Sequence, residues 1–378
     1  MMNQYLENLD LFRRISENPY EYGRSVKEDA GKPVIGYFCT YAPEELIHAA
    51  GAHPFRMFGT TGNIERAEAH LQSYCCSLVR GGLEDALAGR LGFLDGAVFP
   101  HTCDSIQRLS DIWRLNAGFG IHIDTVLPVK LNTPAAHKYM IDVLHTTVRD
   151  LERAFGKTIT EGEIAASVAV YNRIRRSLLS LYAMIDRNPG VMDAEAMYHI
   201  LRAVMVMDRE EAASGLEALA GGLEESAEPA GSAGRKRILL AGGICSHPDI
   251  YRLINEAGAD IVSDDLCTGL RYADGLIDEA ERPVEAIAKR SLGRMVCPAK
   301  HLAVSARGEH LFTEVNRKRI DGVIFLQLKF CDPHAFDYPY LKDRLEGESV
   351  ASMLLEIEQQ PPPEGQLRTR FETFVEML

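Results

Sequence analysis

Short apolar runs alternate along most of the chain with longer stretches of helical periodicity. VIGYF at 34–38, GAVF at 96–99 and ILLAGG at 238–243 are bounded by Pro, Gly or charged residues, which is typical of strands buried on both faces. Apolar positions three and four residues apart between these runs predict helices. Strands separated by helices form parallel sheets covered on both sides, so the pattern predicts an α/β fold.

This alternating pattern occurs twice, with a region of helical periodicity alone in between. That region ends in a small and polar stretch, EESAEPAGSAGRKR, which is typical of a linker. We therefore expect a helical segment at 1–31, an α/β lobe at 32–134, a helical connector and linker at 135–235, and a second α/β lobe with a C-terminal helix at 236–378.

The two α/β segments repeat the same order of units. LDGAVFPHTCDS at 94–105 and IDGVIFLQLKFCDP at 320–333 both place Asp-Gly before an apolar run and Cys-Asp after it. We infer two Rossmann- or flavodoxin-like lobes with parallel sheets, related by duplication. Ligands bind at the carboxyl ends of such strands, so lobes that face each other would bring Cys103 and Cys331 into one cleft.

Two local features complete the prediction. CCSLVRGGLEDALAG, 75–89, predicts a helix that is interrupted at its two consecutive glycines. IDTVLPVKL, 123–131, predicts a buried strand.

Composition narrows the classes of function. Apolar residues make up 46% of the chain and charged residues 25%, as in soluble globular proteins. A net charge of −13 with no basic run disfavours nucleic acid and anionic membrane surfaces as partners. The chain has neither the apolar run of a membrane span nor a secretory signal at its polar N-terminus. We expect a cytoplasmic protein, in which cysteines remain free thiols or bind metal.

The cysteines are the main candidates for a functional site in this sequence. Thiolates are the usual ligands of iron–sulfur clusters, and Cys103 and Cys331 would supply one from each lobe. A third could come from Cys75 or Cys76, where a helix N-terminus favours the thiolate. Adjacent side chains point in different directions, so only one of that pair should bind. Cys39 and Cys75 are expected to be inert core thiols.

Other motifs leave two interpretations open. Three histidines each lie within three residues of a cysteine: His101, His247 and His334. They could act as hydrogen-bond donors or acids at a site, or they could be ordinary polar loop residues. SDDLCTGLRY, 263–272, fits either a capped helix start with an ion pair or a substrate site. AGGIC, 241–245, is no full dinucleotide fingerprint, and no P-loop pattern occurs, so the sequence has no motif for hydrolysing ATP.

Several of these stretches together resemble the benzoyl-CoA reductase and 2-hydroxyacyl-CoA dehydratase family. The resemblance extends from about residue 32 to the end of the chain, and HLQSYCCSLVRG and HTCDSIQRLSDIWR are most similar to the C-subunit branch of the reductases. The motifs that carry it are IGYFCTYAPEELIHAAGAHPFRMFG, CCSLVRG, FPHTCDSIQRLSDIW, LAGGICSHPDIYRLINEAGADIVSDDLCTGLRY, LQLKFCDPHAFDYPYLK and GQLRTRFETFVEML.

The resemblance implies a [4Fe-4S] cluster held by Cys76, Cys103 and Cys331. It also implies an acyl-CoA substrate, a sister subunit of the same fold and a separate ATPase with its own cluster that donates single electrons. The activity so implied is low-potential reduction of an aromatic acyl-CoA thioester in anaerobic aromatic degradation. The thioester would stabilise the radical anion, and a nearby acid would protonate it.

Three alternatives stay open at this point. A 2-hydroxyacyl-CoA dehydratase subunit would use the same machinery to remove water. A double-cubane cluster reductase would bind two bridged cubanes through six thiols of one chain, with Cys245, Cys267 and Cys297 as the additional set. A subunit that only transfers electrons would carry the cluster without acting on substrate.

Overall fold

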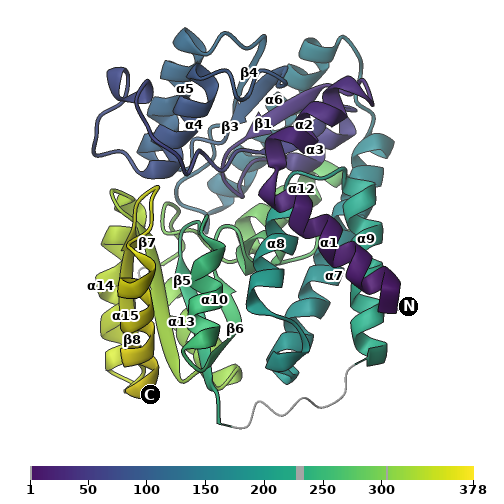
Figure 1. The fold of residues 1–378 in the computed structure, drawn as a ribbon. Coiled ribbons are helices and arrows are strands. Elements are labelled where there is room, and N and C mark those ends of the chain that lie inside the picture. The colour runs from purple at the N-terminus through teal and green to yellow at the C-terminus, as the bar shows by residue number, and fades with distance from the viewer. Residues whose placement is uncertain (1, 227–233, 304) are drawn as a thin grey trace.

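A computed structural model describes residues 2–226, 234–303 and 305–378. The chain forms two α/β lobes, drawn one above the other in Figure 1, with a group of helices beside the lower lobe. No helix in the described ranges is long and apolar enough to cross a membrane.

The first lobe contains a parallel sheet with the order β2-β1-β3-β4. Its strands are β1 (Val34–Tyr37), β2 (His53–Arg56), β3 (Gly96–Phe99) and β4 (Ile121–Asp124). All residues of the first three strands are buried, as their continuous apolar runs predict.

The second lobe repeats this topology with the order β6-β5-β7-β8, again all parallel. Its strands are β5 (Lys236–Gly242), β6 (Ala259–Asp265), β7 (Gly322–Leu328) and β8 (Ala351–Ile357). The shared order confirms the predicted α/β class with two flavodoxin-like lobes.

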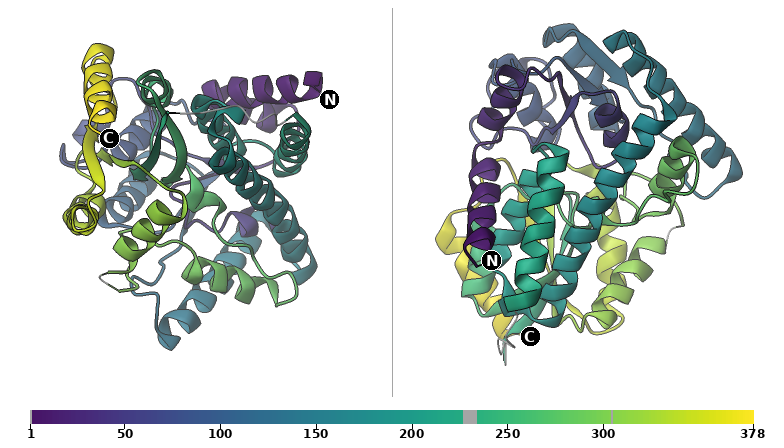
Figure 2. Two further views of the ribbon diagram at one scale, coloured as in Figure 1. Left: turned by 90° about the horizontal axis from the view of Figure 1, so that it is seen from below. Right: turned by 90° about the vertical axis from the view of Figure 1, so that its right-hand side faces the viewer.

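Helices pack around both sheets and form the group beside the second lobe. They are α1 (Met2–Glu17), α2 (Pro19–Glu28), α3 (Glu44–Ala49), α4 (Ser77–Leu87), α5 (Asp104–Asn116), α6 (Pro134–Phe155), α7 (Glu161–Arg187), α8 (Ala194–Val204), α9 (Arg209–Ser226), α10 (Pro248–Glu256), α11 (Leu270–Ala273), α12 (Pro283–Gly293), α13 (Ala306–Arg317), α14 (Asp332–Glu346) and α15 (Glu364–Glu376), with short 3₁₀ turns at Ala67–Ala69 and Pro189–Val191. Figure 2 shows α1 lying along α8 and α9.

Helix α7 connects the lobes through polar contacts along its length. A capping box at Thr160 and Glu163 fixes its start. Its Ser167 hydroxyl donates to the Glu45 carbonyl in the first lobe (2.8 Å). Near its other end, Tyr182 donates to Asp264 in the second lobe. These contacts fix the two lobes relative to one helix.

Two local predictions were wrong. Helix α4 runs unbroken through Gly81 and Gly82, because their lack of side chains lets Thr60 and Phe38 pack directly on the helix. The fourth strand spans Ile121–Asp124 and ends before Val126, since Pro128 interrupts the pairing expected farther along.

Candidate functional site

One cavity between the lobes is lined by six of the eight cysteines. The space that it encloses, together with its opening to solvent, is about 590 Å³. The cysteines on its wall are Cys39, Cys76, Cys103, Cys267, Cys297 and Cys331. We call it the thiol cavity.

The cavity lies at the point where the strand order reverses in each sheet. Cys39 follows β1 and Cys103 follows the neighbouring β3, while Gly243 follows β5 and Cys331 comes soon after β7. Crevices at this reversal are where open parallel sheets bind ligands. The shared strand order therefore places two such crevices opposite each other, with one shared space between them.

Three of the thiols sit directly before the first residue of a helix. Cys76 precedes α4, Cys103 precedes α5 and Cys331 precedes α14, so each occupies the N-cap position. The unpaired N–H groups and the positive end of the helix dipole at these starts favour negative charge on the sulfur.

Burial acts against ionisation of these three thiols. It raises the pKa of Cys103 to about 12 and also raises the pKa values of Cys76 and Cys331, although backbone N–H groups in the following turns oppose the shift. Without a bound cation the three groups are neutral thiols. A metal centre would displace their protons, since only thiolates are ligands.

The other side of the cavity has a different electrostatic character. The Cys297 thiol hydrogen-bonds to Cys267, and this bond, with the Arg271 guanidinium and His334, lowers the pKa of Cys267 against the effect of burial. Arg271 Nη1 lies 3.6 Å from Cys267 Sγ. The surroundings of Cys267 therefore favour its ionised form, beside a buried cation.

Arg271 is itself part of a buried ionic network. Its Nε lies 2.7 Å from Asp265 Oδ1, and Arg307 contacts the second Asp265 oxygen at 2.9 Å. Despite burial, these guanidinium groups lower the pKa of Asp265. The 263–272 stretch thus forms the predicted ion pair, and the same Arg271 also reaches a thiol of the cavity.

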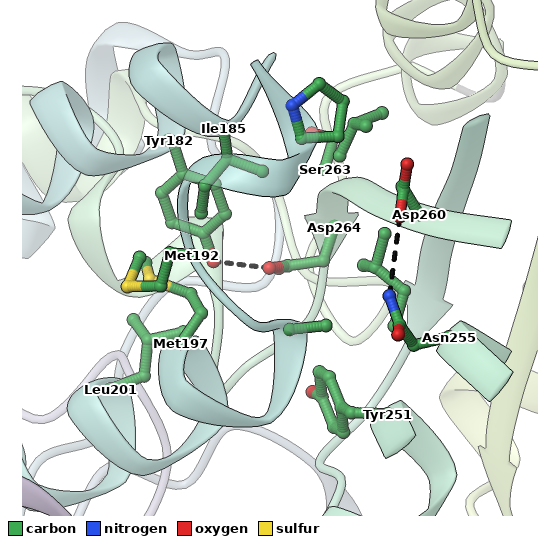
Figure 3. Close-up of a pocket in the computed structure, with 14 residues that line it drawn as sticks. Tyr182, Ile185, Met192, Met197, Leu201, Tyr251, Asn255, Asp260, Ser263 and Asp264 are labelled. Carbon is green, nitrogen blue, oxygen red and sulfur yellow. Dashed lines mark hydrogen bonds between the residues drawn. The ribbon is translucent and has the colours of Figure 1, made fainter. Parts of the chain in front are cut away.

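The turn that carries Cys267 is held from behind by Asp264. Its Oδ1 accepts from the backbone N–H groups of Leu266 (3.1 Å) and Leu270 (2.7 Å). Figure 3 shows Tyr182 of α7 hydrogen-bonded to this carboxylate beside a small, mainly apolar cavity. The contacts fix the loop in which Cys267 lies.

Arg56 is a buried cation on the wall of the thiol cavity. It ends β2 and is only 1% exposed. Its guanidinium lies over the Tyr37 ring at 5.6 Å, and its Nε has no hydrogen-bond partner among the described residues. A buried charge of this kind is costly unless an anion faces it.

The donor set fits an iron–sulfur cluster better than a single ion. Within the described residues no three Cys, His, Asp or Glu side chains gather closely enough to hold one metal ion. A cluster binds each thiolate through a different iron, so its ligands stand farther apart. Three thiols from separate helix starts around one mainly apolar space match that requirement.

Comparison with known proteins identifies the family. The HGD-D family, 2-hydroxyglutaryl-CoA dehydratase, D-component, matches residues 39–378. The chain belongs to this family. The predicted resemblance is thereby confirmed.

Relatives of this HGD-D member include both reductase and dehydratase subunits. It is 29% identical to the benzoyl-CoA reductase C subunit of Thauera aromatica, over 85% of this chain and 84% of the relative. It is 26% identical to the (R)-phenyllactyl-CoA dehydratase beta subunit of Clostridium sporogenes, over 97% of both chains. It is also 26% identical to the lactoyl-CoA dehydratase beta subunit of Anaerotignum propionicum, over 98% of both.

In this HGD-D chain, the two cysteines of the adjacent pair do separate. Cys76 lines the thiol cavity, whereas Cys75 lies outside it with Sγ 3.9 Å from Gln72 Oε1. Two other thiols lie elsewhere than expected. Cys39, expected in the core, lines the cavity; Cys245, expected with Cys267 and Cys297, lies outside it with Sγ 3.6 Å from the His247 carbonyl.

Backbone direction accounts for the position of Cys39. Cys39 has a left-handed φ of 63°, so the chain turns sharply there and leaves the thiol on the cavity wall.

The three histidines near cysteines lie in different surroundings. His334 lines the cavity, His101 pairs with Asp124 at 2.7 Å, and His247 contacts the Glu358 carbonyl at 3.5 Å.

Sequence reasoning missed Arg56 altogether. The available signal was a charged residue closing the buried HPFR strand, 53–56, directly at a carboxyl end.

Proposed function

We propose that the chain is an iron–sulfur subunit of an ATP-dependent, benzoyl-CoA reductase-like enzyme. The observation that carries the proposal is the convergence of Cys76, Cys103 and Cys331 from both lobes on one cavity. These thiols would hold a [4Fe-4S] cluster, which when bound supplies single electrons of low potential.

The residues of this chain would prepare the cavity for electron transfer. Leu78, Val79, Ile106 and Leu328 line it with apolar surface and so keep water away from a reactive acyl group. Arg56 would place its positive charge against the negative charge that an added electron creates on a thioester. A sister subunit and a separate ATPase would complete the enzyme.

A 2-hydroxyacyl-CoA dehydratase subunit is the second candidate. It is favoured by the dehydratase beta subunits, which align over 97% and 98% of both chains. The thiol set and the apolar wall serve either reaction, because both begin with one electron added to a CoA thioester.

A double-cubane cluster is favoured by a different observation. Cys39, Cys267 and Cys297 line the same cavity as the first three thiols, so six are available to one bound group. Cys39 replaces Cys245 in this set. A subunit of this type need not act on a CoA ester.

The test is anaerobic purification of the chain with its sister subunit, followed by iron analysis and turnover with the ATPase. About four irons per chain supports one cubane and about eight supports two. Reduction of benzoyl-CoA supports the reductase, and dehydration of a 2-hydroxyacyl-CoA supports the dehydratase. Iron-loaded protein that neither binds nor converts either ester would leave electron transfer as its role, and protein without iron would overturn the proposal.

A further inference from the structure

Two more cavities adjoin the thiol cavity in a row. The first, here the bridge cavity, measures about 290 Å³ and shares Leu78, Ile244 and Leu328 with the thiol cavity. The second, here the outer cavity, measures about 850 Å³ and shares Thr60 and Thr61 with the bridge cavity. Shared walls place the three side by side, leading from the space between the lobes to the surface at α2 and α8.

The bridge cavity combines apolar and hydrogen-bonding groups. Phe58 and Leu78 supply apolar wall, while Ser77, Ser246 and His247 supply polar atoms. Two side chains of the second lobe reach the first lobe beside it: Gln359 Nε2 lies 3.4 Å from the Gly62 carbonyl, and Gln360 Nε2 lies 3.5 Å from Asn63 Oδ1. Such a lining suits a narrow chain of methylene and amide groups.

The outer cavity presents two arginines. Arg24 is exposed and pairs with no carboxylate among the described residues. Arg202 lies with its guanidinium 3.9 Å above the Phe58 ring, and its buried Nη1 has no described partner. Two acids line the same cavity. Glu17 pairs with Arg13 at 3.1 Å, whereas Glu21 forms no ion pair with a described residue. Guanidinium groups with N–H donors that no carboxylate occupies are suited to binding phosphate oxygens.

A glycine-rich loop lies between the arginines and the bridge cavity. Residues 59–62 read GTTG, and Gly59 has a left-handed φ of 73°. A Cβ at Gly59 would stand 3.0 Å from the Leu78 carbonyl oxygen, so glycine lets the loop pack on α4. Thr60 and Thr61 of this loop line the outer cavity, and the Thr60 hydroxyl accepts from the Gly62 N–H at 3.0 Å. Tight glycine-containing turns of this kind are common in backbone sites that bind phosphate.

We infer that these cavities bind the coenzyme A part of the thioester. Arg24, Arg202 and the 59–62 loop would hold the phosphates, the pantetheine arm would pass through the bridge cavity, and the acyl group would reach the thiol cavity. This inference rests on the proposed function, because it assigns a place to the substrate of that same site.

Calorimetric titration of the full chain with coenzyme A and with pantetheine, which lacks the phosphates, tests it. Coenzyme A should bind more tightly, and Arg24→Gln should weaken it by about tenfold, the effect of losing a charge-assisted hydrogen bond, without changing pantetheine binding. The matched control is Arg14→Gln, an exposed arginine of neighbouring α1 that forms no ion pair with a described residue and does not line the outer cavity.

Equal affinities for coenzyme A and pantetheine would overturn the inference, and so would equal losses in Arg24→Gln and Arg14→Gln. Arg202→Gln offers a second position and should weaken coenzyme A but not pantetheine. Binding is measured without turnover, so failure here leaves the iron analysis untouched. Conversely, a chain without iron that still binds coenzyme A through Arg24 would refute the proposed function and keep this inference.

Discussion

At the scale of single residues, each thiol at a helix start is subject to two opposing effects. Burial favours the neutral thiol, and the helix N-terminus favours the thiolate. Burial has the larger effect on the pKa values of Cys76, Cys103 and Cys331. A positively charged metal centre is therefore needed to shift these thiols to the thiolate form. Cys267 instead gains a thiol donor and an arginine from its surroundings.

Replacing one of the proposed ligands should therefore release iron. Cys103→Ser and Cys331→Ser are each expected to lose most of the bound iron, because two thiolates hold a cubane poorly. Iron analysis and the visible absorption of anaerobically purified protein measure the loss. Cys75→Ser is the matched control, since Cys75 adjoins Cys76 but lies outside the cavity. Full iron in the Cys103 variant would remove it from the ligand set.

Glu84 predicts how stability depends on pH. This buried carboxylate of α4 accepts from the N–H groups of Glu65 (3.0 Å), Arg66 (2.7 Å) and Ala67 (2.9 Å). Although burial opposes it, these donors lower the pKa of Glu84. Its stabilising effect is thus present above the unfolded pKa of about 4.3 and is lost as the pH falls through the lower folded value.

Glu84→Gln should reduce stability at neutral pH by about 1–3 kcal/mol and should lessen the decline of stability below about pH 4.3. Urea unfolding of iron-free protein at several pH values measures both effects. Glu28→Gln, at an exposed position of α2, should change neither. Parallel pH curves for wild type and Glu84→Gln would contradict this interpretation.

At the scale of elements, α4 serves two sites at once. Its start carries Cys76, and its second turn packs against the 59–62 loop through Gly81. A Cβ at Gly81 would lie 2.9 Å from the Thr60 nitrogen and 3.0 Å from the Thr60 oxygen. Because these are backbone atoms, the loop itself must move to admit a methyl group.

Gly81→Ala is therefore expected to cost about 1–3 kcal/mol of stability, the usual penalty of overpacking, and to weaken binding of coenzyme A. Chemical denaturation and calorimetric titration measure the two effects. Gly221→Ala is the control, because this glycine lies within α9 and a Cβ there meets no described atom within 4 Å. There the substitution should be neutral or stabilising. A stabilised Gly81 variant would show that the loop is free to shift.

At the scale of the whole molecule, the proposed cluster joins the two lobes. Cys76 and Cys103 belong to the first lobe and Cys331 to the second, so bound iron should stabilise their mutual arrangement. Thermal unfolding of iron-loaded protein is expected several degrees above that of protein treated with a chelator. In Cys331→Ser the difference should disappear, while Cys75→Ser should keep it. Identical midpoints in wild-type protein would argue against a ligand set that spans the lobes.

Much of this architecture was predictable because the signals are local. Buried parallel strands are continuous apolar runs, and the recurrent Asp-Gly-strand-Cys-Asp unit indicated two lobes of similar topology. The position of Cys39 on the cavity wall was not predictable, since a single left-handed residue decides which way this thiol points. Arg56 also escaped notice, because its importance lies in its burial beside the cavity with an Nε that has no hydrogen-bond partner among the described residues. The outer cavity unites α2, α8 and a loop near residue 60, which no local pattern connects.

The position of Cys331 late in the chain has a consequence for biosynthesis. A ribosome releases Cys76 and Cys103 more than two hundred residues before Cys331 emerges. A cubane bound by all three can therefore be completed only after Cys331 has been translated. A chain that terminated before Cys331 would lack the ligand from the second lobe, and it should hold the cluster poorly.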